Sequence, residues 1–454
     1  MIARFLHHDW LLPGYLVLCI VLGGASAAGA LANGLVQLLA VLLLAAMWFW
    51  DDRRKRYTFA SAHRWFGYFI LAVLLWTIIQ IIPLPPNIWS NLPGREILTK
   101  SLEMFGNEAD DWRSIALEPE YTLASALSFL PPLAVLGLGL KAERRSLHLA
   151  VYAVIGLAIF STAIGIIQLL QGPSSPLYFY DISSKSTSTG FFANSNHLAT
   201  LLLIAMIFSV SAIPGGSSLS RKNGTIAAGA FIWLATSIYL AFNLLVNRSL
   251  AGFGLAMIAI AYLLLMLWGS WRGRFPDGKK LILVIVAAMS LFPIVVIGLY
   301  DWLSEFVQQG TRPETRLLFN SLTWEAVKDF FPFGTGLGNF RWIYSGYETD
   351  AILQSNYVNH VHNDWHELLL QGGVFAILIV GLFLWALIRH LIADIVSERL
   401  LDKPERWAPY LALLMVLLHS IVDYPLRTSA IAGVTALCVV YILRTRRFNP
   451  HLLN

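Results

Sequence analysis

Long apolar runs separated by short polar segments dominate the chain. A membrane span needs roughly 20 mainly apolar residues, and these runs approach or exceed that length. The predicted spans are 11–31, 32–50, 66–82, 122–140, 147–170, 194–213, 225–245, 250–268, 281–300, 368–389, 408–422 and 429–443. We therefore expect an all-α, polytopic membrane protein with about 12 transmembrane helices.

The first apolar run also has features of a secretory signal. Arg4 precedes it, and the small residues Ala25, Ser26 and Ala27 follow its centre, as at a signal-peptide cleavage site. A second apolar run begins almost immediately afterwards. We therefore expect the two runs to be retained as a helical hairpin.

The distribution of charge predicts the orientation in the membrane. With both termini in the cytoplasm, the inner segments hold 22 of the 32 basic residues and 9 of the 27 acidic residues. This excess of Lys and Arg inside follows the positive-inside rule. It predicts four outer segments that are long or polar enough to hold chemistry: 83–121, 171–193, 301–367 and 423–428.

Composition limits the alternatives. Hydrophobic residues make up 57% of the chain and charged residues 13%, which excludes a disordered protein and disfavours a soluble enzyme. Cys19 and Cys438 both lie in apolar runs and form no disulfide framework. No CxxC or HExxH motif occurs, so we expect no structural metal and no cofactor. The net charge is +5. In a membrane protein, the side of the membrane on which the charges lie is more informative than their total, so we expect no nucleic-acid partner.

The longest outer segment contains a helical pattern. Residues 316–330 lack Gly and Pro, and Pro313 and Pro332 bracket them. Leu317, Phe319, Asn320, Trp324 and Val327 recur at helical spacing, so we expect them to face the membrane domain. Arg316 is in the first turn, where a cation is unfavourable for the helix dipole. It is either a solvated side chain or a ligand for an anion.

Two polar motifs follow this helix. Gly334, Gly336 and Gly338 alternate, which allows either a tight turn or a backbone that closely approaches a phosphate or sugar. Next come His360, His362 and His366, directly before the tenth span. On a helix, His362 and His366 would share a face and could hold a metal. A neutral imidazole there could also act as a general base, or the cluster could anchor the chain at the interface.

Two further arginines interrupt apolar surroundings. Arg248, between Asn247 and Ser249, occupies a tight outer turn between two spans, where a cation usually faces a cavity or a partner. Arg427 lies four residues after Asp423, and the two could form an ion pair, which would be either structural or functional.

These motifs resemble those of the O-antigen ligase and O-antigen polymerase superfamily of bacterial envelope glycosyltransferases. The resemblance runs from about 190 to 430. It is carried by Phe191–Leu198, Asn247–Ser249, Arg316 with Trp324 and Pro332, Gly334–Gly338, His362–Asn363 with Glu367–Gly373, and His419–Thr428. Asn247 is a departure, because family members often have Ser there. The division that follows is an N-terminal helical part at 1–190, a catalytic membrane part at 191–443 and a basic cytoplasmic tail at 444–454.

The resemblance implies a fold of the GT-C type and glycan transfer on the periplasmic face of the bacterial inner membrane. The donor would be a glycan on a polyprenyl diphosphate lipid, and the acceptor would be another glycan or a lipid core. Arg248 and Arg316 would bind the diphosphate, and His362 would be the base. Asn247, Gly336, Gly338, Asn363, Asp423 and Arg427 would support them. No metal or cofactor is implied. The segment 423–428 leans towards an exopolysaccharide-type polymerase rather than a ligase.

Three other functions remain open at this point. A lipid-glycan flippase or transporter would have a similar number of spans, but it should carry charged groups near mid-membrane. A metal-dependent transferase could use Glu108, Asp110 and Asp111. A purely structural subunit of a polysaccharide machine would leave Arg248 without a purpose.

Overall fold

The computed structural model describes residues 9–26, 29–50, 64–104, 111–212, 228–272, 313–348, 357–397 and 404–444. Within these ranges the chain is helical, and the only extended pairing is one bridge between Leu84 and Arg113. The apolar helices are α2 Leu11–Leu22, α3 Ala30–Trp50, α4 Arg64–Ile81, α8 Leu130–Lys141, α9 Arg144–Gln171, α10 Ser195–Ala212, α11 Ala228–Val246, α12 Leu250–Arg272, α17 Asp364–Val396, α18 Ala408–His419 and α19 Ser429–Arg444. The all-α prediction is confirmed for these residues.

Shorter helices lie mostly between the long apolar helices, and the one at Pro119–Leu127 overlaps the predicted span 122–140. They are α5 Pro86–Trp89, α6 Glu96–Met104, α7 Pro119–Leu127, α15 Pro313–Phe330, α16 Phe340–Ser345 and two 3₁₀ turns, η3 Pro404–Trp407 and η4 Pro425–Arg427. The helix predicted at 316–330 is thus present as α15. The pattern did not predict α5 and α6.

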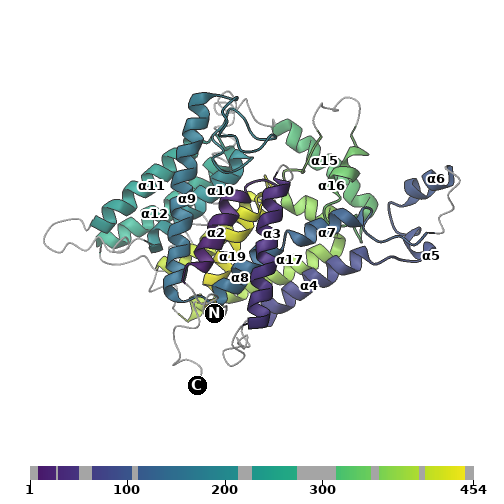
Figure 1. The fold of residues 1–454 in the computed structure, drawn as a ribbon, viewed down its shortest axis with the longest axis horizontal. Helices are drawn as coiled ribbons and strands as arrows, with labels where there is room; N and C mark the ends of the chain where they lie inside the picture. Colours follow the sequence, from purple (N-terminus) through teal and green to yellow (C-terminus); the bar gives the residue numbers. More distant parts are fainter. Residues whose placement is uncertain are drawn as a thin grey trace, which may run out of the picture.

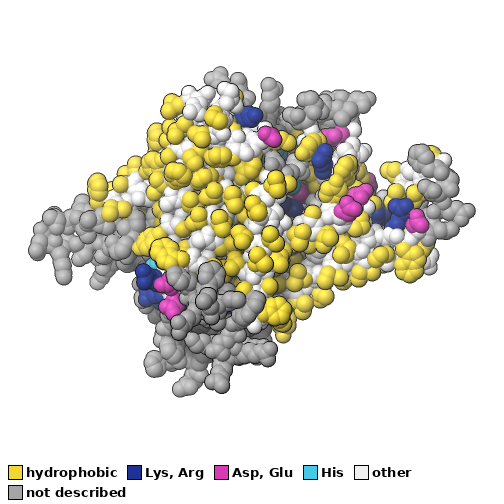
Figure 2. All heavy atoms as spheres, viewed as in Figure 1, with side chains coloured by type: hydrophobic (Ala, Val, Ile, Leu, Met, Phe, Trp, Pro, Cys, Tyr) yellow, Lys and Arg dark blue, Asp and Glu magenta, His cyan; other side chains and the backbone are white. Residues whose placement is uncertain are grey.

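The number of membrane spans stays a prediction. Among the described residues, four helical stretches are long and apolar enough to cross a membrane: Ala30–Phe49, Pro119–Lys141, Arg144–Gln171 and Asp364–Val396. Seven further apolar helices are shorter. Together they account for every predicted span except 281–300, which lies outside the described residues. Large apolar side chains such as Leu31 and Trp48 are more than four-fifths exposed, and apolar atoms cover much of the face in Figure 2, as expected where lipid is the solvent.

One predicted span needs correction, and a second contains a break between two helices. The run at 11–31 is helical only to Leu22, because Gly23 and Gly24 turn the chain there. A Cβ at Gly24 would lie 2.1 Å from the carbonyl oxygen of Phe191, so the turn requires glycine. The run at 122–140 is split into α7 and α8 around Phe129, close to Pro131 and Pro132, which cannot continue a helix from the preceding turn.

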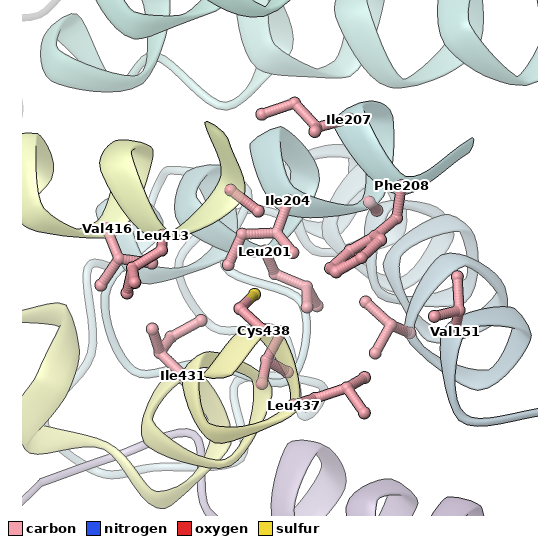
Figure 3. Packing of buried hydrophobic residues seen from close by; sticks show 14 of the residues in the cluster. Val151, Leu201, Ile204, Ile207, Phe208, Leu413, Val416, Ile431, Leu437 and Cys438 are labelled. Atoms are coloured by element: carbon pink, nitrogen blue, oxygen red, sulfur yellow. The ribbon is translucent and has the colours of Figure 1, made fainter. Parts of the chain in front are cut away.

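One hydrophobic core joins the first and last thirds of the chain. Helix α19 packs against α2, α8 and α18, while α10 packs against α9, α11, α12 and α18. Figure 3 shows Val151 of α9, Phe208 of α10, Val416 of α18 and Cys438 of α19 turned towards one another. The predicted N-terminal and catalytic parts therefore share a core across residue 190.

The two ends of this bundle gather different segments. At one end, Arg444 donates to the carbonyl oxygen of Gly139 (2.8 Å), and Arg145 approaches Asp9 (3.6 Å). At the other end, the Ala193 and Ala430 amides donate to the carbonyls of Gly24 and Gly23 (3.1 and 3.0 Å). Helices α15 and α16 lie at this second end, at the upper right in Figure 1. Segments predicted to be outside thus converge at one end of the bundle.

Helix α15 packs through only part of the predicted face, and the expected burial is confirmed for Phe319 and Val327. Phe319, Val327 and Phe330 are buried against α16 and α17 in a second small core. Leu317 is 72% exposed and Trp324 is 44% exposed. The buried face therefore follows Phe319, Val327 and Phe330, and the expectation for Leu317 and Trp324 was wrong.

Candidate functional site

The loop between α18 and η4 places a buried carboxylate at the centre of the converging segments. Asp423 is fully buried and accepts hydrogen bonds from the side-chain amides of Asn194 (3.3 Å) and Asn196. It also accepts from the backbone N–H of Tyr424 (2.8 Å). Asn194 and Asn196 begin α10, so this carboxylate ties two parts of the chain that lie far apart in sequence.

His362 faces this carboxylate from the segment before α17. Its Nδ1 lies 3.4 Å from Oδ1 of Asp423, and its ring contacts that of Tyr424 at 5.0 Å between centroids. Burial lowers the pKa of His362 and outweighs the attraction of Asp423. Burial alone would raise the pKa of Asp423, but His362 and Arg316 hold it well below its usual value. At neutral pH the pair is therefore a neutral imidazole beside an ionised carboxylate.

Arg316 approaches the same loop from the first turn of α15. Its Nη1 donates to the carbonyl oxygen of Val422 (3.1 Å), next to Asp423. Its Nε is buried and has no hydrogen-bond acceptor. A buried N–H without an acceptor is costly, so this guanidinium is suited to an added oxyanion.

Arg248 occupies a turn that is fixed by its two neighbours. The side-chain amide of Asn247 donates to the carbonyls of Ser188 (2.7 Å) and Ser195 (2.9 Å). Ser249 donates to Oδ1 of Asn196 (2.6 Å) and caps α12 by accepting from the Gly252 amide. Through Asn196, the Arg248 turn is thus joined to Asp423.

Arg248 and His362 share an unusual backbone conformation. Their φ angles are +60° and +58°, and Ser186 is the one other non-glycine residue with positive φ in the described ranges. This region is disfavoured for residues with a Cβ and is seen most often where function demands it. The structure therefore holds both predicted site residues in a strained conformation.

Arg427 does not pair with Asp423. Its Nε donates to Asp364 (3.2 Å), and its Nη2 lies 3.5 Å from Glu367. These two carboxylates raise the pKa of Arg427 against the opposing effect of burial. The expected pair four residues apart was wrong, because Pro425 begins a 3₁₀ turn and no α-helix joins the two residues.

The three histidines have separate partners. Asn363 caps α17 by accepting from the amides of Trp365 and His366, so His362 precedes the helix and does not share a face with His366. His360 Nδ1 lies 3.0 Å from Glu367, and its ring is 4.3 Å from that of Tyr424. The helical geometry assumed for a metal site at His362 and His366 is therefore absent. Of the alternative acidic cluster, Glu108 and Asp110 lie outside the described residues.

The alternating glycines bind the protein's own backbone. Helix α17 is interrupted at Gly373 (φ +58°), and this break frees backbone groups of the preceding turn. The amides of Thr335 and Gly336 donate to the carbonyls of Leu370 and Gln371, both at 3.0 Å. Gly336 has φ +93°, and an added Cβ would lie 2.5 Å from that of Ala116. Gly338 (φ +81°) approaches the Tyr121 carbonyl in the same way. The glycine motif is therefore a tight turn, and its amides donate to the carbonyl groups that the break in α17 leaves free.

Sequence patterns missed part of the site. His197 is buried, its Nε2 lies 3.8 Å from Asp423, and neither ring nitrogen has a hydrogen-bond partner. His419 pairs with Thr200 (2.8 Å). The signal for His197 was the polar run Asn194–His197 at the start of an apolar span. Among the aromatic residues of the predicted outer segment 301–367, Phe340 and Tyr344 are buried, whereas Trp342 is 47% exposed.

The assembled features define a helical membrane protein with a buried carboxylate, an imidazole and arginines at one end of its bundle. A family model described as O-antigen ligase matches residues 235–381. The predicted membership of the O-antigen ligase and polymerase superfamily is thereby confirmed over this segment, which contains Arg248, Arg316 and His362. A search of curated proteins found no match.

Proposed function

We propose that this protein is a membrane glycosyltransferase that transfers a glycan from a polyprenyl diphosphate lipid to an acceptor sugar hydroxyl. The observation that carries the proposal is that His362 lies 3.4 Å from the buried carboxylate of Asp423, while Arg316 donates to the carbonyl oxygen of the preceding residue, Val422. The reaction needs a cation for the leaving group and a base for the acceptor, and these side chains supply both.

The leaving group is the first requirement. When the acceptor oxygen attacks the anomeric carbon, the bond from that carbon to the phosphate oxygen breaks and its electron pair stays on the diphosphate. Guanidinium groups match phosphate oxygens with two parallel N–H donors. Arg316 has a buried Nε without an acceptor, and Arg248 sits in the neighbouring strained turn. Both therefore bind the diphosphate in this proposal.

The acceptor proton is the second requirement. Nδ1 of His362 faces Asp423, which favours the tautomer with its proton on Nδ1 and leaves Nε2 to take the proton of the hydroxyl. Asp423 then stabilises the imidazolium that forms, as a carboxylate does for an imidazole base in other enzymes. Asn194 and Asn196 hold the carboxylate in place.

The location is part of the proposal. The basic residues predict that this end of the bundle faces the periplasm, where the lipid-linked donor would be presented. A polymerase, whose acceptor is a second lipid-linked glycan, remains the favoured type.

A reconstituted reaction tests the proposal. Purified protein in proteoliposomes receives a polyprenyl diphosphate glycan, and the products are separated by mass. We expect a longer lipid-linked glycan, and one free polyprenyl diphosphate for each glycosidic bond formed. Movement of the intact donor across the bilayer with no bond cleavage would show a flippase instead.

A further inference from the structure

A second group of basic side chains lies in the outer segment 83–121, which packs against the Gly334–Gly338 turn and α15 but contains none of the proposed transfer residues. The backbone of Leu84 pairs with that of Arg113 (2.9 and 3.1 Å). The indole of Trp89 donates to the carbonyl of Asp111 (2.8 Å), and Trp89 is fully buried. These contacts fold the segment around Arg95 and Arg113, next to α5 and α6 at the right of Figure 1.

Arg95 is buried without a counter-charge. Its side chain is 2% exposed, and Nη2 donates to the carbonyl oxygen of Ile115. Its Nε is buried and has no acceptor. Arginine is rarely so deeply buried unless it is paired, yet in the described part of the chain no ion pair joins Arg95 to a carboxylate.

Arg113 makes the imbalance larger. Its guanidinium lies 5.5 Å from the ring centroid of Trp89, and its Nε is also buried without an acceptor. Burial and the nearby Arg113 charge lower the pKa of Arg95 to about 10. Arg95 donates to Ile115, two residues after Arg113, so two like charges and two unsatisfied N–H donors lie in one folded segment. An oxyanion would neutralise the charges and accept from both donors.

The exposed apolar side chains near these arginines indicate which kind of molecule would contain the anion. Ile82 and Ile88 are each 47% exposed, and Ile97 and Met104 on α6 are 80% and 85% exposed. Ile78, near the outer end of α4, is also 51% exposed. Apolar side chains beside paired arginines are typical of a surface that meets lipid at the level of the headgroups.

We propose that Arg95 and Arg113 form a binding site for the phosphate headgroup of a membrane lipid. The phosphate accepts hydrogen bonds from both guanidinium groups, and the acyl or prenyl chain lies along Ile88 and Ile97. This site is separate from the proposed transfer site, and neither depends on the other.

Native mass spectrometry of the purified full chain tests the site. The probes are dioctanoyl phosphatidylglycerol, decaprenyl phosphate, uncharged dioctanoylglycerol and inorganic phosphate. We expect the two phosphate lipids to bind, and the one that binds more tightly identifies the source. We expect Arg113→Gln to weaken that binding roughly 10- to 100-fold, the value of one or two charge-assisted hydrogen bonds.

Lys100→Gln is the matched control, because Lys100 is exposed on α6 and its loss removes the same charge from the same segment. It should leave binding unchanged. Arg95→Gln could disturb folding, so Arg113→Gln, at a less buried position, decides the outcome. Equal weakening by Lys100→Gln, equal binding of dioctanoylglycerol, or competition by inorganic phosphate at the concentration of the lipid would overturn the proposal.

Discussion

Replacement of Asp423 by asparagine tests the electrostatic part of the proposed mechanism. The substitution keeps the size of the side chain and removes its charge, 3.4 Å from Nδ1 of His362. At that distance two unit charges interact by about 5 kcal/mol with an effective dielectric constant of about 20. Because asparagine can still hydrogen-bond the ring, we expect only part of this loss, on the order of a 100- to 1,000-fold decrease in kcat.

The pH–rate profile should show in which direction the charge of Asp423 shifts the pKa of His362. In the native protein, Asp423 raises the pKa of His362, while burial lowers it more strongly. The neutral base therefore persists below the usual imidazole pKa of about 6.5, and the acidic limb of the pH–rate profile should lie below that value. Removing the charge of Asp423 should move this limb to still lower pH, together with the lower maximal rate.

The assay is transfer by purified protein under saturating donor, measured from pH 4.5 to 8. Asp329→Asn is the control, because Asp329 is an acid on α15 that accepts from Tyr347 (2.6 Å) and is not part of the site. It should change kcat little. An Asp423→Asn variant with native kcat, or with an acidic limb at higher pH, would refute the assignment.

Three further predictions concern the donor site, the topology and the fold. Arg316→Lys should weaken donor binding as Arg316→Ala does, because lysine lacks the planar fork; unchanged affinity in both would remove Arg316 from the site. A cysteine at Ser345 should react in intact cells with an impermeant reagent and one at Ser270 should not, and the native Cys19 and Cys438 are buried; the reverse pattern would invert the orientation. Gly373→Ala should destabilise the protein by at least about 2 kcal/mol, since its Cβ would meet the Pro332 carbonyl at 2.0 Å; Gly381→Ala, with open space around it, should not lower the thermal midpoint.

The apolar runs predicted most of the helices, because burial in lipid requires continuous helical hydrogen bonding. The ends of the helices were harder to place. Gly23 and Gly24 stop α2 where the hydropathy continues, since their close approach to Phe191 is a tertiary contact. The kink at Gly373 likewise depends on the distant segment at Pro332.

The site could be predicted by residue type but not by contact. Arg316 and His362 stood out as charged or titratable groups in an outer segment. The Asp423 loop beside both residues is joined to Asn194, 229 residues away, and no local periodicity contains that contact. Two pairs were inferred from a spacing of four residues, and both were wrong. His362 and His366 do not share a helix face, because Asn363 caps α17 after His362. Asp423 and Arg427 do not pair, because Pro425 begins a 3₁₀ turn between them.

The central claim is that His362 acts as the base while the arginines hold the donor. Single-turnover transfer and donor binding by His362→Ala, beside the His366→Ala control, test it most directly. His366 contacts Trp324 and does not contact Asp423, so it controls for loss of a nearby imidazole. We predict a decrease in the transfer rate on the order of 100- to 10,000-fold for His362→Ala, with donor affinity retained, and a near-native rate for His366→Ala. A native rate in His362→Ala, or an equal loss in both variants, would contradict the account.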